Sequence, residues 1–479
     1  MNIYAWIMLG YFVLVVLIGL LTKKVASQSA SDYLIAGRNM GVMVCAVVVA
    51  AEWLGGMSTI GVSEKAFKTM TLQPIFYNIA TAIGMVIIGF TVAAHYRQKG
   101  VHTVSEMIES LFGSQARHIS AVVFLIAYIT LAYIQLQTCA GVMAPLFHIS
   151  WTWAVIISAA IITLYTYVGG MHALASTGIV YLVTMYLGLG IAFVVGLFKI
   201  GGLGVLHAKL VALGAPQNLY NPFSAGFNDA FVLLLGGVLG GMAAQASIQP
   251  IFAARNVSTA KRASVLAGLI VAPFGIMAAI LGLIARTGVY FNVEQYPNAK
   301  TAMAKLLVTP EFIHPVLGGL ALAGVLAAIL STVGPVNFAV VTIAAKDIYH
   351  GIIHKEADDK RLITIAQRLV VLVGVITVPL AILMKGAVLD MAYISYAIRA
   401  IGAIVVVMGL YARRWITPLG VKLSFAIGTV VIFFTIVAQQ MKWFTLDKTY
   451  GAVITTIIII VLSTLGDRLF GKRPAEASK

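Results

Sequence analysis

Two ionisable side chains stand inside long apolar segments of this sequence. Glu52 lies in "AAEWLGGMSTIG" (50–61), and Arg399 lies in "MAYISYAIRAIGAIVVV" (391–407). An ionised side chain at the centre of a membrane helix costs at least about 2.5–3.5 kcal/mol, so such residues nearly always pair or bind something. Glu52 and Arg399 could form a permanent ion pair, or Arg399 could snorkel without a partner. Alternatively, a solute carboxylate takes Arg399 and a solute amino group takes Glu52.

Glycine and proline interrupt three of the apolar segments. Gly55-Gly56 follows Glu52, "GGVLGGMAAQASIQP" (236–250) carries four glycines, and Gly334-Pro335 stands in the middle of a third segment. Proline removes a helical hydrogen bond, and glycine lowers the cost of unwinding. Backbone groups freed at membrane depth must face protein or a wet cavity. Paired interruptions in the two halves of a chain are typical of transporters built from inverted repeats.

The composition places these segments in a membrane. Hydrophobic residues make up 61% of the 479 residues, charged residues only 10%, and the mean hydropathy is +0.98. A soluble protein needs far more charge on its exterior. We expect an all-α polytopic membrane protein in the cell inner (plasma) membrane, with about thirteen spans. These spans fall near 4–22, 41–63, 73–95, 119–146, 151–168, 176–198, 228–252, 264–285, 317–344, 365–384, 388–411, 420–440 and 450–466.

The net charge of +16 reports topology rather than a nucleic-acid partner. Most lysines and arginines fall in alternating loops, for example Lys261-Arg262 and Arg413-Arg414, which is the positive-inside bias. This pattern predicts an N-terminus outside and a C-terminus inside. The two cysteines, Cys45 and Cys139, fall inside spans and are expected to be buried apolar residues.

The chain reads as one transmembrane domain (1–479) with two repeats. Repeat 1 is expected over 39–200 and repeat 2 over 220–415, each beginning with a broken helix. An extra first helix and inner loop (1–38) precede them. Two further C-terminal helices at 420–440 and 450–466, with a tail, occupy 416–479. Within 96–118, "TVSEMIESLFG" predicts a short amphipathic helix on the inner surface, capped by Thr103 or Ser105.

Four motifs, in register over most of the chain, resemble the sodium/solute symporter family. They are "SDYLIAGRNMG" (31–41), "YTYVGGMHALASTGIVY" (165–181), "AAILSTVGPVNFAVVTIAAKDIY" (327–349) and "GLYARRW" (409–415). In the family the second of these is the loop between the fifth and sixth spans. The resemblance implies a LeuT-type fold with a 5+5 inverted repeat, alternating access, and symport of a small solute with sodium.

The resemblance also implies a sodium site. The family's common site, carried over by motif, consists of Ala46, Val49, Ala328, Ser331 and Thr332. Sodium is a hard cation that favours neutral or anionic oxygens, which carbonyls and hydroxyls supply. The alternative is that the two hydroxyls only bond the preceding helical turn.

A second sodium site of some family members lacks its ligands here. The family's "TD" motif reads Thr177-Gly178, so its Asp is absent. The matching ninth-span positions are Gly334 and Pro335, which offer no hydroxyl. The sequence therefore predicts one sodium ion per solute.

By analogy with the family, the solute binds at mid-membrane among the broken helices. The substrate candidates are Glu52, Trp53, Phe76, Asn78, Gln135, Gln245, Gln249 and Arg399. Trp53 could stack on a solute or attract a cation, or it could be a packing residue behind the break.

An amino acid or another small carboxylate fits these candidates best. A choline-like organic cation is the first alternative, but the counterparts of the choline branch's aromatic cage are Thr81, Ala132 and Ala244. The sugar-transporting branch shares an acidic residue at Glu52 but uses more polar residues on other spans.

Secondary active transport is the leading function, with lipid, sodium and a small solute as the partners and no nucleic acid. A non-transporting solute sensor is an alternative, although only a short segment follows the last expected span. A channel is less expected because the sequence lacks a repeated selectivity-filter motif. An enzyme is not expected, because neither a His, Cys or acidic cluster at ligand spacing nor a nucleophile with a base in reach is evident.

Overall fold

The computed structural model of the chain describes residues 3–21, 40–295, 298–384 and 386–469, and these are helical with short connections. The first half contains α1 (Ile3–Leu21), α4 (Val42–Trp53), η2 (Met57–Gly61), α5 (Val62–Thr69), η3 (Gln73–Ile75), α6 (Phe76–Phe90), α7 (Ala93–Lys99), α8 (Val104–Phe112), α9 (Ser114–Phe147), α10 (Trp151–Ile200) and α11 (Gly202–Ala212). The second half contains α12 (Phe227–Met242), α13 (Gln245–Phe252), α14 (Val257–Val271), α15 (Phe274–Arg286), η4 (Val293–Gln295), η5 (Ala299–Thr301), α16 (Ala302–Leu307), α17 (Pro315–Thr342), η6 (Ile343–Ile353), α18 (Asp359–Leu383), α19 (Val388–Tyr411), η7 (Arg413–Trp415), α20 (Pro418–Gln440) and α21 (Lys448–Leu469).

The membrane character of these helices is confirmed. Among the described residues, nine helices are long and apolar enough to cross a membrane, and two bent pairs raise that number to as many as eleven. Ile3–Val15 and Trp151–Leu164 are shorter apolar helical stretches. The number thirteen and the sidedness of the termini stay predictions.

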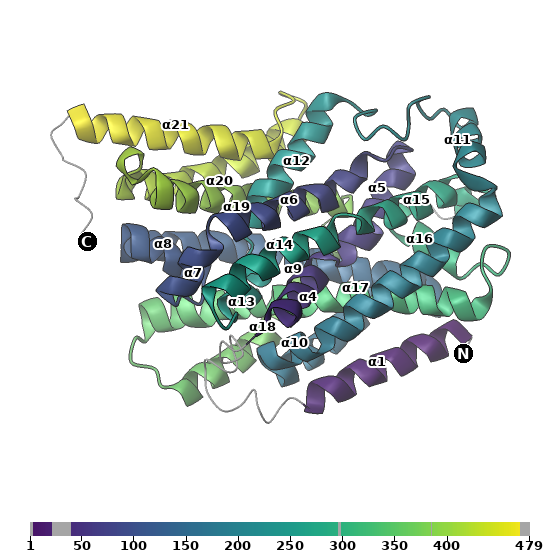
Figure 1. Cartoon of the computed structure of the whole chain (residues 1–479), viewed down its shortest axis with the longest axis horizontal. Helices are drawn as coiled ribbons and strands as arrows, with labels where there is room; N and C mark the ends of the chain where they lie inside the picture. Colours follow the sequence, from purple (N-terminus) through teal and green to yellow (C-terminus); the bar gives the residue numbers. More distant parts are fainter. Residues whose placement is uncertain (1–2, 22–39, 296–297, 385, 470–479) are drawn as a thin grey trace.

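The arrangement of the outer helices bears on the topology. α1 and α21 run in the same direction along the long axis, so the start of α1 and the end of α21 lie at opposite ends of the molecule (Figure 1). A chain that crosses the membrane an odd number of times must have its first and last spans running in the same direction. α20 and α21 pack side by side at one edge of the bundle, and α1 lies at the opposite edge (Figure 1).

The expected break after Glu52 is present. α4 and the helical segment 57–69 are bent by 52°. A Cβ at Gly55 would lie 1.9 Å from the hydroxyl oxygen of Thr332, and one at Gly56 would lie 2.3 Å from that of Thr138. These two glycines therefore serve close approach as well as unwinding, because no side chain fits between the broken helix and its neighbours.

The second expected break is also present, but the third is not. α12 and α13 are bent by 40°. By contrast, α17 continues through Gly334-Pro335 to Thr342, and the irregular part follows as the π-helical η6. The prediction of an interruption at Gly334-Pro335 is wrong, because the buried surroundings of α17 hold the helix together. Proline removes only the bond that its own N–H would donate to the carbonyl of Ser331, four residues earlier.

The segment expected to connect the fifth and sixth spans is helical. α10 covers Trp151–Ile200 without an irregular residue, whereas we expected a loop between 168 and 176. The segment contains glycines but no proline, so every residue keeps the N–H that a helix requires. The side chains of 165 and 168–176 lie outside the described part of the structure.

Two further expectations concern smaller features. Thr103 is the N-cap residue of α8, and its hydroxyl oxygen accepts a hydrogen bond from the backbone N–H of Glu106 (3.0 Å). It is one of the two residues that we expected to cap this helix. Cys45 and Cys139 are free and buried, as expected. The inner loop 23–38 and most of the motif 31–41 lie outside the described residues, as does the tail from 470 onward.

Candidate functional site

Three hydroxyl groups bond the last carbonyls of α4, where the helix is broken. Ser331 donates to the carbonyl of Ala51 (2.6 Å), Thr332 to that of Glu52, and Ser58 to that of Trp53 (2.8 Å). The final carbonyls of a helix have no partner within it, and they form the negative end of its dipole. The break therefore concentrates carbonyl and hydroxyl oxygens at one buried point between α4 and α17.

The expected sodium ligands lie around this point, with one difference. Ala328 contributes its carbonyl to the hydroxyls of Ser331 (2.9 Å) and Thr332 (3.4 Å). Both hydroxyls contact the last turn of α4 rather than the carbonyls of Ala46 and Val49, which are buried earlier in the same helix. Ala46 and Val49 precede the last turn, so their carbonyls are placed for bonds within α4.

The donor set suits sodium. Neutral carbonyl and hydroxyl oxygens are the ligands that unwound helices and helix C-terminal ends provide for sodium in transporters. Ser331 and Thr332 are almost fully buried, so water competes little for this position.

The carboxylate of Glu52 points from the end of α4 toward the start of α13. Its side chain is 6% exposed and accepts a hydrogen bond from the hydroxyl of Ser247. Ser247 lies in the first turn of α13, whose N-terminal end favours negative charge. The carboxylate thus joins the two broken helices. The ion pairs among the described residues do not include one between Glu52 and Arg399.

The guanidinium of Arg399 lies among aromatic rings. Its central carbon is 4.1 Å from the ring centre of Tyr396, 5.7 Å from that of Tyr128 and 6.0 Å from that of Trp53. Arg399 is 2% exposed, and its Nε and Nη2 atoms have no hydrogen-bond partner in the described structure. An unsatisfied buried donor is costly, more so when it is charged. Two nitrogen atoms of a buried cation, Nε and Nη2, therefore have no acceptor among the described residues.

Two further buried donors without a partner lie near the same break. Trp53 Nε1 has none in the described structure, nor does Gln135 Nε2. The side-chain oxygen of Gln135 accepts from Thr138 (3.2 Å) and lies 2.9 Å from a Cβ placed at Gly56. Gln135 therefore packs directly against the break.

The other substrate candidates divide into two groups. Asn78 is near the break, because its amide donates to Ser58 (3.2 Å). The side chain of Gln245 makes two hydrogen bonds at the start of α8. Its amide oxygen accepts from the backbone N–H of Val104 (2.8 Å), and its amide nitrogen donates to the carbonyl of His102 (2.9 Å). Both ends of its amide are therefore used in holding α13 to α8.

Gln249 and Phe76 also contact other parts of the structure. Gln249 donates to the hydroxyl of Thr342 in α17 (3.4 Å). Phe76 packs edge-on against Phe223, with ring centres 4.9 Å apart, in the connection before α12. These contacts favour structural roles for both residues.

The tyrosines around Arg399 were not expected from the sequence. The hydroxyls of Tyr77 and Tyr396 lie 2.7 Å apart, and the hydroxyl of Tyr128 accepts from the N–H of Ala246 (3.2 Å). The sequence does contain one signal for the contact between Tyr396 and Arg399, because residues three apart meet on one helix face. Tyr128 comes from α9, and no local pattern relates it to Arg399.

A polar pocket lies on one side of this tyrosine group. It has a volume of about 360 Å³, and Tyr393 is one of its walls. Its ionisable lining residues are Lys65, Asp229, Asp390, Asp447 and Lys448. Tyr393 also packs on Tyr396, with ring centres 5.1 Å apart, and Tyr396 in turn packs on the guanidinium of Arg399.

An ionic cluster holds α8 against α9 and η6 on the opposite side. Arg117 contacts Glu106 (3.2 Å), Glu109 (2.7 Å) and the fully buried Asp347 (3.0 Å). Burial acts to raise the pKa of Glu106, but hydrogen bonds and charge from His102 and the charge of Arg117 outweigh it and lower this pKa to about 2. Glu106 therefore stays ionised at neutral pH and keeps α8 in place.

Comparisons with known proteins agree with this architecture. The sequence profile of the sodium:solute symporter family matches residues 33–421. The chain is 25% identical to the high affinity choline transporter 1 of Homo sapiens, over 78% of this chain and 67% of that protein. It is 23% identical to the osmoregulated proline transporter OpuE of Bacillus subtilis, over 100% and 97%. It is 24% identical to the sodium/proline symporter of Escherichia coli, over 96% and 93%.

Solved structures confirm the expected LeuT-type fold. A Na+-coupled sialic acid symporter superimposes with a TM-score of 0.79 at 16% identity, covering 98% of both chains. Mhp1, a nucleobase-cation-symport-1 family transporter, gives 0.60 at 14% identity, covering 93% of this chain and 95% of its own. The family match spans most of the sequence, and the fold agrees with it. The chain therefore belongs to the sodium:solute symporter family.

Proposed function

We propose that this protein is a sodium-coupled symporter of a small solute that carries a carboxylate. The observation that carries the proposal is the buried guanidinium of Arg399 beside the broken end of α4, whose Nε and Nη2 atoms have no acceptor in the described part of the chain. A carboxylate offers two oxygens to such a planar fork. Trp53 Nε1 and Gln135 Nε2, which also have no partner among the residues described, are further donors for the same ligand.

Sodium would bind between α4 and α17. Ser331, Thr332 and the carbonyl of Ala328 are the proposed ligands, with carbonyls of α4 completing the set. Ala46 and Val49 remain proposed ligands, although the hydroxyls now contact Ala51 and Glu52.

One sodium ion per solute is proposed. Gly178 packs against α4, where a Cβ would lie 3.2 Å from the side chain of Val48, so a carboxylate at this position has little room. Gly334 and Pro335 supply no hydroxyl from α17. A sodium Hill coefficient near one supports this stoichiometry, whereas a value near two contradicts it.

An organic cation is the second candidate solute, because choline transporters are among the relatives. Trp53, Tyr128 and Tyr396 do surround a cation, but that cation is Arg399 itself. A cationic solute placed among these rings would be repelled by Arg399 and would need a different binding site. The geometry therefore favours an anionic or zwitterionic solute.

A thermal-shift experiment tests the solute class. The purified protein is heated with choline, proline or pyruvate as cationic, zwitterionic and anionic probes, each with sodium or with potassium. A ligand of the folded state raises the apparent melting temperature, and coupling requires sodium to strengthen the effect. We expect sodium-dependent shifts with proline or pyruvate. A sodium-dependent shift with choline alone would contradict the carboxylate proposal.

The two repeats are proposed to be related through their broken helices. α4 with α5, and α12 with α13, would be the equivalent first helices. Met40, two residues before α4, pairs with the segment that follows α13: the Met40 N–H donates to the carbonyl of Ala253, and the Met40 carbonyl accepts from the N–H of Arg255 (both 3.0 Å). These bonds couple the two broken helices at the side of the molecule where α8 lies, so that they would move together.

A further inference from the structure

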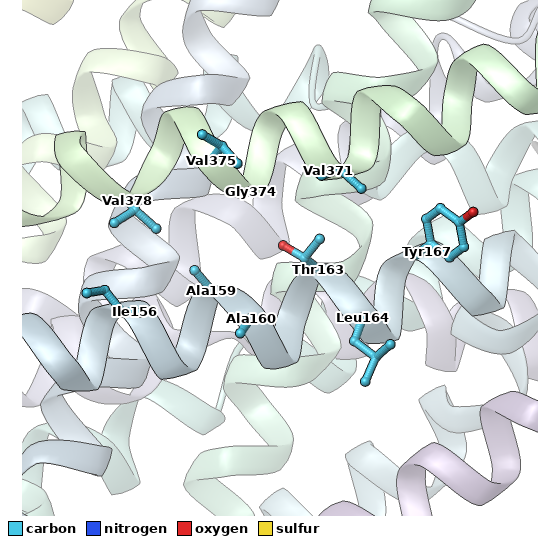
Figure 2. Close-up of a pocket in the computed structure, with 10 residues that line it drawn as sticks. All are labelled: Ile156, Ala159, Ala160, Thr163, Leu164, Tyr167, Val371, Gly374, Val375 and Val378. Atoms are coloured by element: carbon cyan, nitrogen blue, oxygen red, sulfur yellow. The ribbon is translucent and has the colours of Figure 1, made fainter.

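An apolar groove runs between the first part of α10 and α18. It has a volume of about 510 Å³, and Thr163 and Tyr167 carry its polar side-chain atoms. Figure 2 shows the two helices antiparallel, with Ile156 and Val378 toward one end of the groove and Tyr167 and Val371 toward the other.

The floor of the groove is a close helix crossing. A Cβ at Gly374 would lie 2.2 Å from the hydroxyl oxygen of Thr163, so the two helices meet there with no side chain between them. Small residues on the same stripe, Ala159 and Ala160, keep the space above the crossing open. Leu164 (62% exposed) and Val375 (65% exposed) form its rims.

The length of the groove matches one leaflet of a bilayer. Ile156 and Tyr167 are eleven residues apart, which is about 16 Å along a helix. The hydrocarbon core is about 30 Å thick, so one leaflet is about 15 Å. A spanning helix of a second copy would be about twice as long as the groove.

The end of the groove near Tyr167 carries the groups that would bind a phosphate. Tyr167 is 41% exposed, and tyrosine is enriched at membrane interfaces. Arg368 lies one turn before Val371 on α18, and its side chain is exposed without a described hydrogen bond or ion pair. Lys360 and Arg361 precede it, on the side to which the positive-inside bias assigns the cytoplasm.

We propose that this groove is a binding site for an anionic phospholipid of the inner leaflet. One acyl chain lies along Ala159, Ala160 and Gly374, and the phosphate meets Arg368 and the hydroxyl of Tyr167. The occupant is a lipid rather than a second copy because the groove is one leaflet long and the exposed Arg368, which has no described partner, lies one helical turn beyond it. Burying Arg368 under a protein helix would leave that charge unpaired.

Native mass spectrometry of the full chain tests the site with two probes of equal acyl length, phosphatidylglycerol and phosphatidylcholine. We expect wild type to retain phosphatidylglycerol about fivefold better, since one basic residue near an anionic headgroup contributes on that order. Arg368→Gln should abolish this preference and leave phosphatidylcholine retention unchanged. Ala160→Phe should fill the groove and lower retention of both lipids.

Matched controls separate the groove from the general surface. Arg262→Gln removes another exposed arginine on the same predicted side, and Ala426→Phe enlarges an exposed alanine on α20. Both should behave as wild type, and gel filtration verifies that each variant is folded. If Ala160→Phe does not fold, Ala160→Leu replaces it.

Two results would overturn the proposal. The first is an unchanged lipid preference in Arg368→Gln, or unchanged retention in the variant that fills the groove. The second is efficient cross-linking between copies through Ala160→Cys in membranes, which would make the groove a subunit interface. Cys45 and Cys139 are buried, so they give little background in that experiment.

Discussion

The hydroxyl of Thr332 in α17 donates a hydrogen bond to the backbone carbonyl of Glu52, the residue that precedes Trp53 at the broken end of α4. The contact requires Gly55, because a Cβ there would overlap the threonine side chain. The proposed sodium site, the helix break and the proposed solute site therefore share one turn of backbone. A cation bound to these oxygens would fix the positions of Trp53 and Glu52, and we propose this as the physical basis for coupling.

Thr332→Val should weaken sodium binding while keeping the shape of the side chain. One lost polar contact to an ion is worth about 1.5–3 kcal/mol, so half-saturation of uptake should need at least about tenfold more sodium. Thr377→Val is the matched control, because among the described residues the Thr377 hydroxyl bonds only carbonyls of its own helix α18. Equal sodium dependence of uptake in the two variants would show that Thr332 is not a sodium ligand.

Arg399→Lys should weaken the binding of a carboxylate solute by about tenfold or more. Lysine keeps the charge but lacks the planar fork that matches a carboxylate, so the loss tests geometry as well as charge. Arg286→Lys, at the end of α15 over the ring of Phe67, is the control and should leave affinity unchanged. Unchanged affinity in Arg399→Lys would contradict a direct role for the guanidinium.

Glu52→Gln distinguishes the two roles that remain for this carboxylate. If Glu52 receives the amino group of the solute, the variant should bind proline at least about tenfold more weakly and pyruvate with unchanged affinity. Ser247→Ala, which removes the hydroxyl that now bonds the carboxylate, should alter proline affinity much less. Unchanged affinity for both probes in Glu52→Gln would assign Glu52 to joining α4 and α13.

Glu106→Gln should destabilise the protein in a pH-dependent manner. The folded pKa of Glu106, about 2, is below the ordinary value near 4.3, so ionised Glu106 stabilises the fold above that ordinary pKa. This contribution is on the order of 3 kcal/mol at neutral pH and is lost as the pH falls toward 2. Thermal unfolding should show a lower melting temperature for the variant at pH 7 and a shrinking difference below pH 4.

Glu109→Gln is the control for that experiment. Its side chain is 35% exposed and contacts only Arg117 among the ion pairs of the cluster, so its effect should be smaller. A constant difference between wild type and Glu106→Gln from pH 7 to pH 3 would contradict the role of the ionised carboxylate.

The sequence predicted features that depend on local chemistry. Membrane segments, the Thr103 cap and the break at Gly55-Gly56 follow from hydropathy, hydrogen-bonding groups and backbone freedom. Pro335 was misjudged, because whether a proline breaks a helix depends on the packing around it. The aromatic surroundings of Arg399 could not be foreseen, since Trp53, Tyr128 and Tyr396 come from three helices far apart in sequence. The partners of Gln245 could not be foreseen for the same reason, because they lie at the start of α8, and its substrate role stays a prediction.

Solute uptake into proteoliposomes tests the central claim most directly. The purified protein is reconstituted, and labelled proline and pyruvate are supplied with an inward sodium gradient, an inward proton gradient or potassium alone. We predict that one of these carboxylates accumulates above its external concentration only with the sodium gradient, with one sodium entering per solute. Accumulation driven equally by protons, or sodium-dependent binding without accumulation, would contradict sodium-coupled symport.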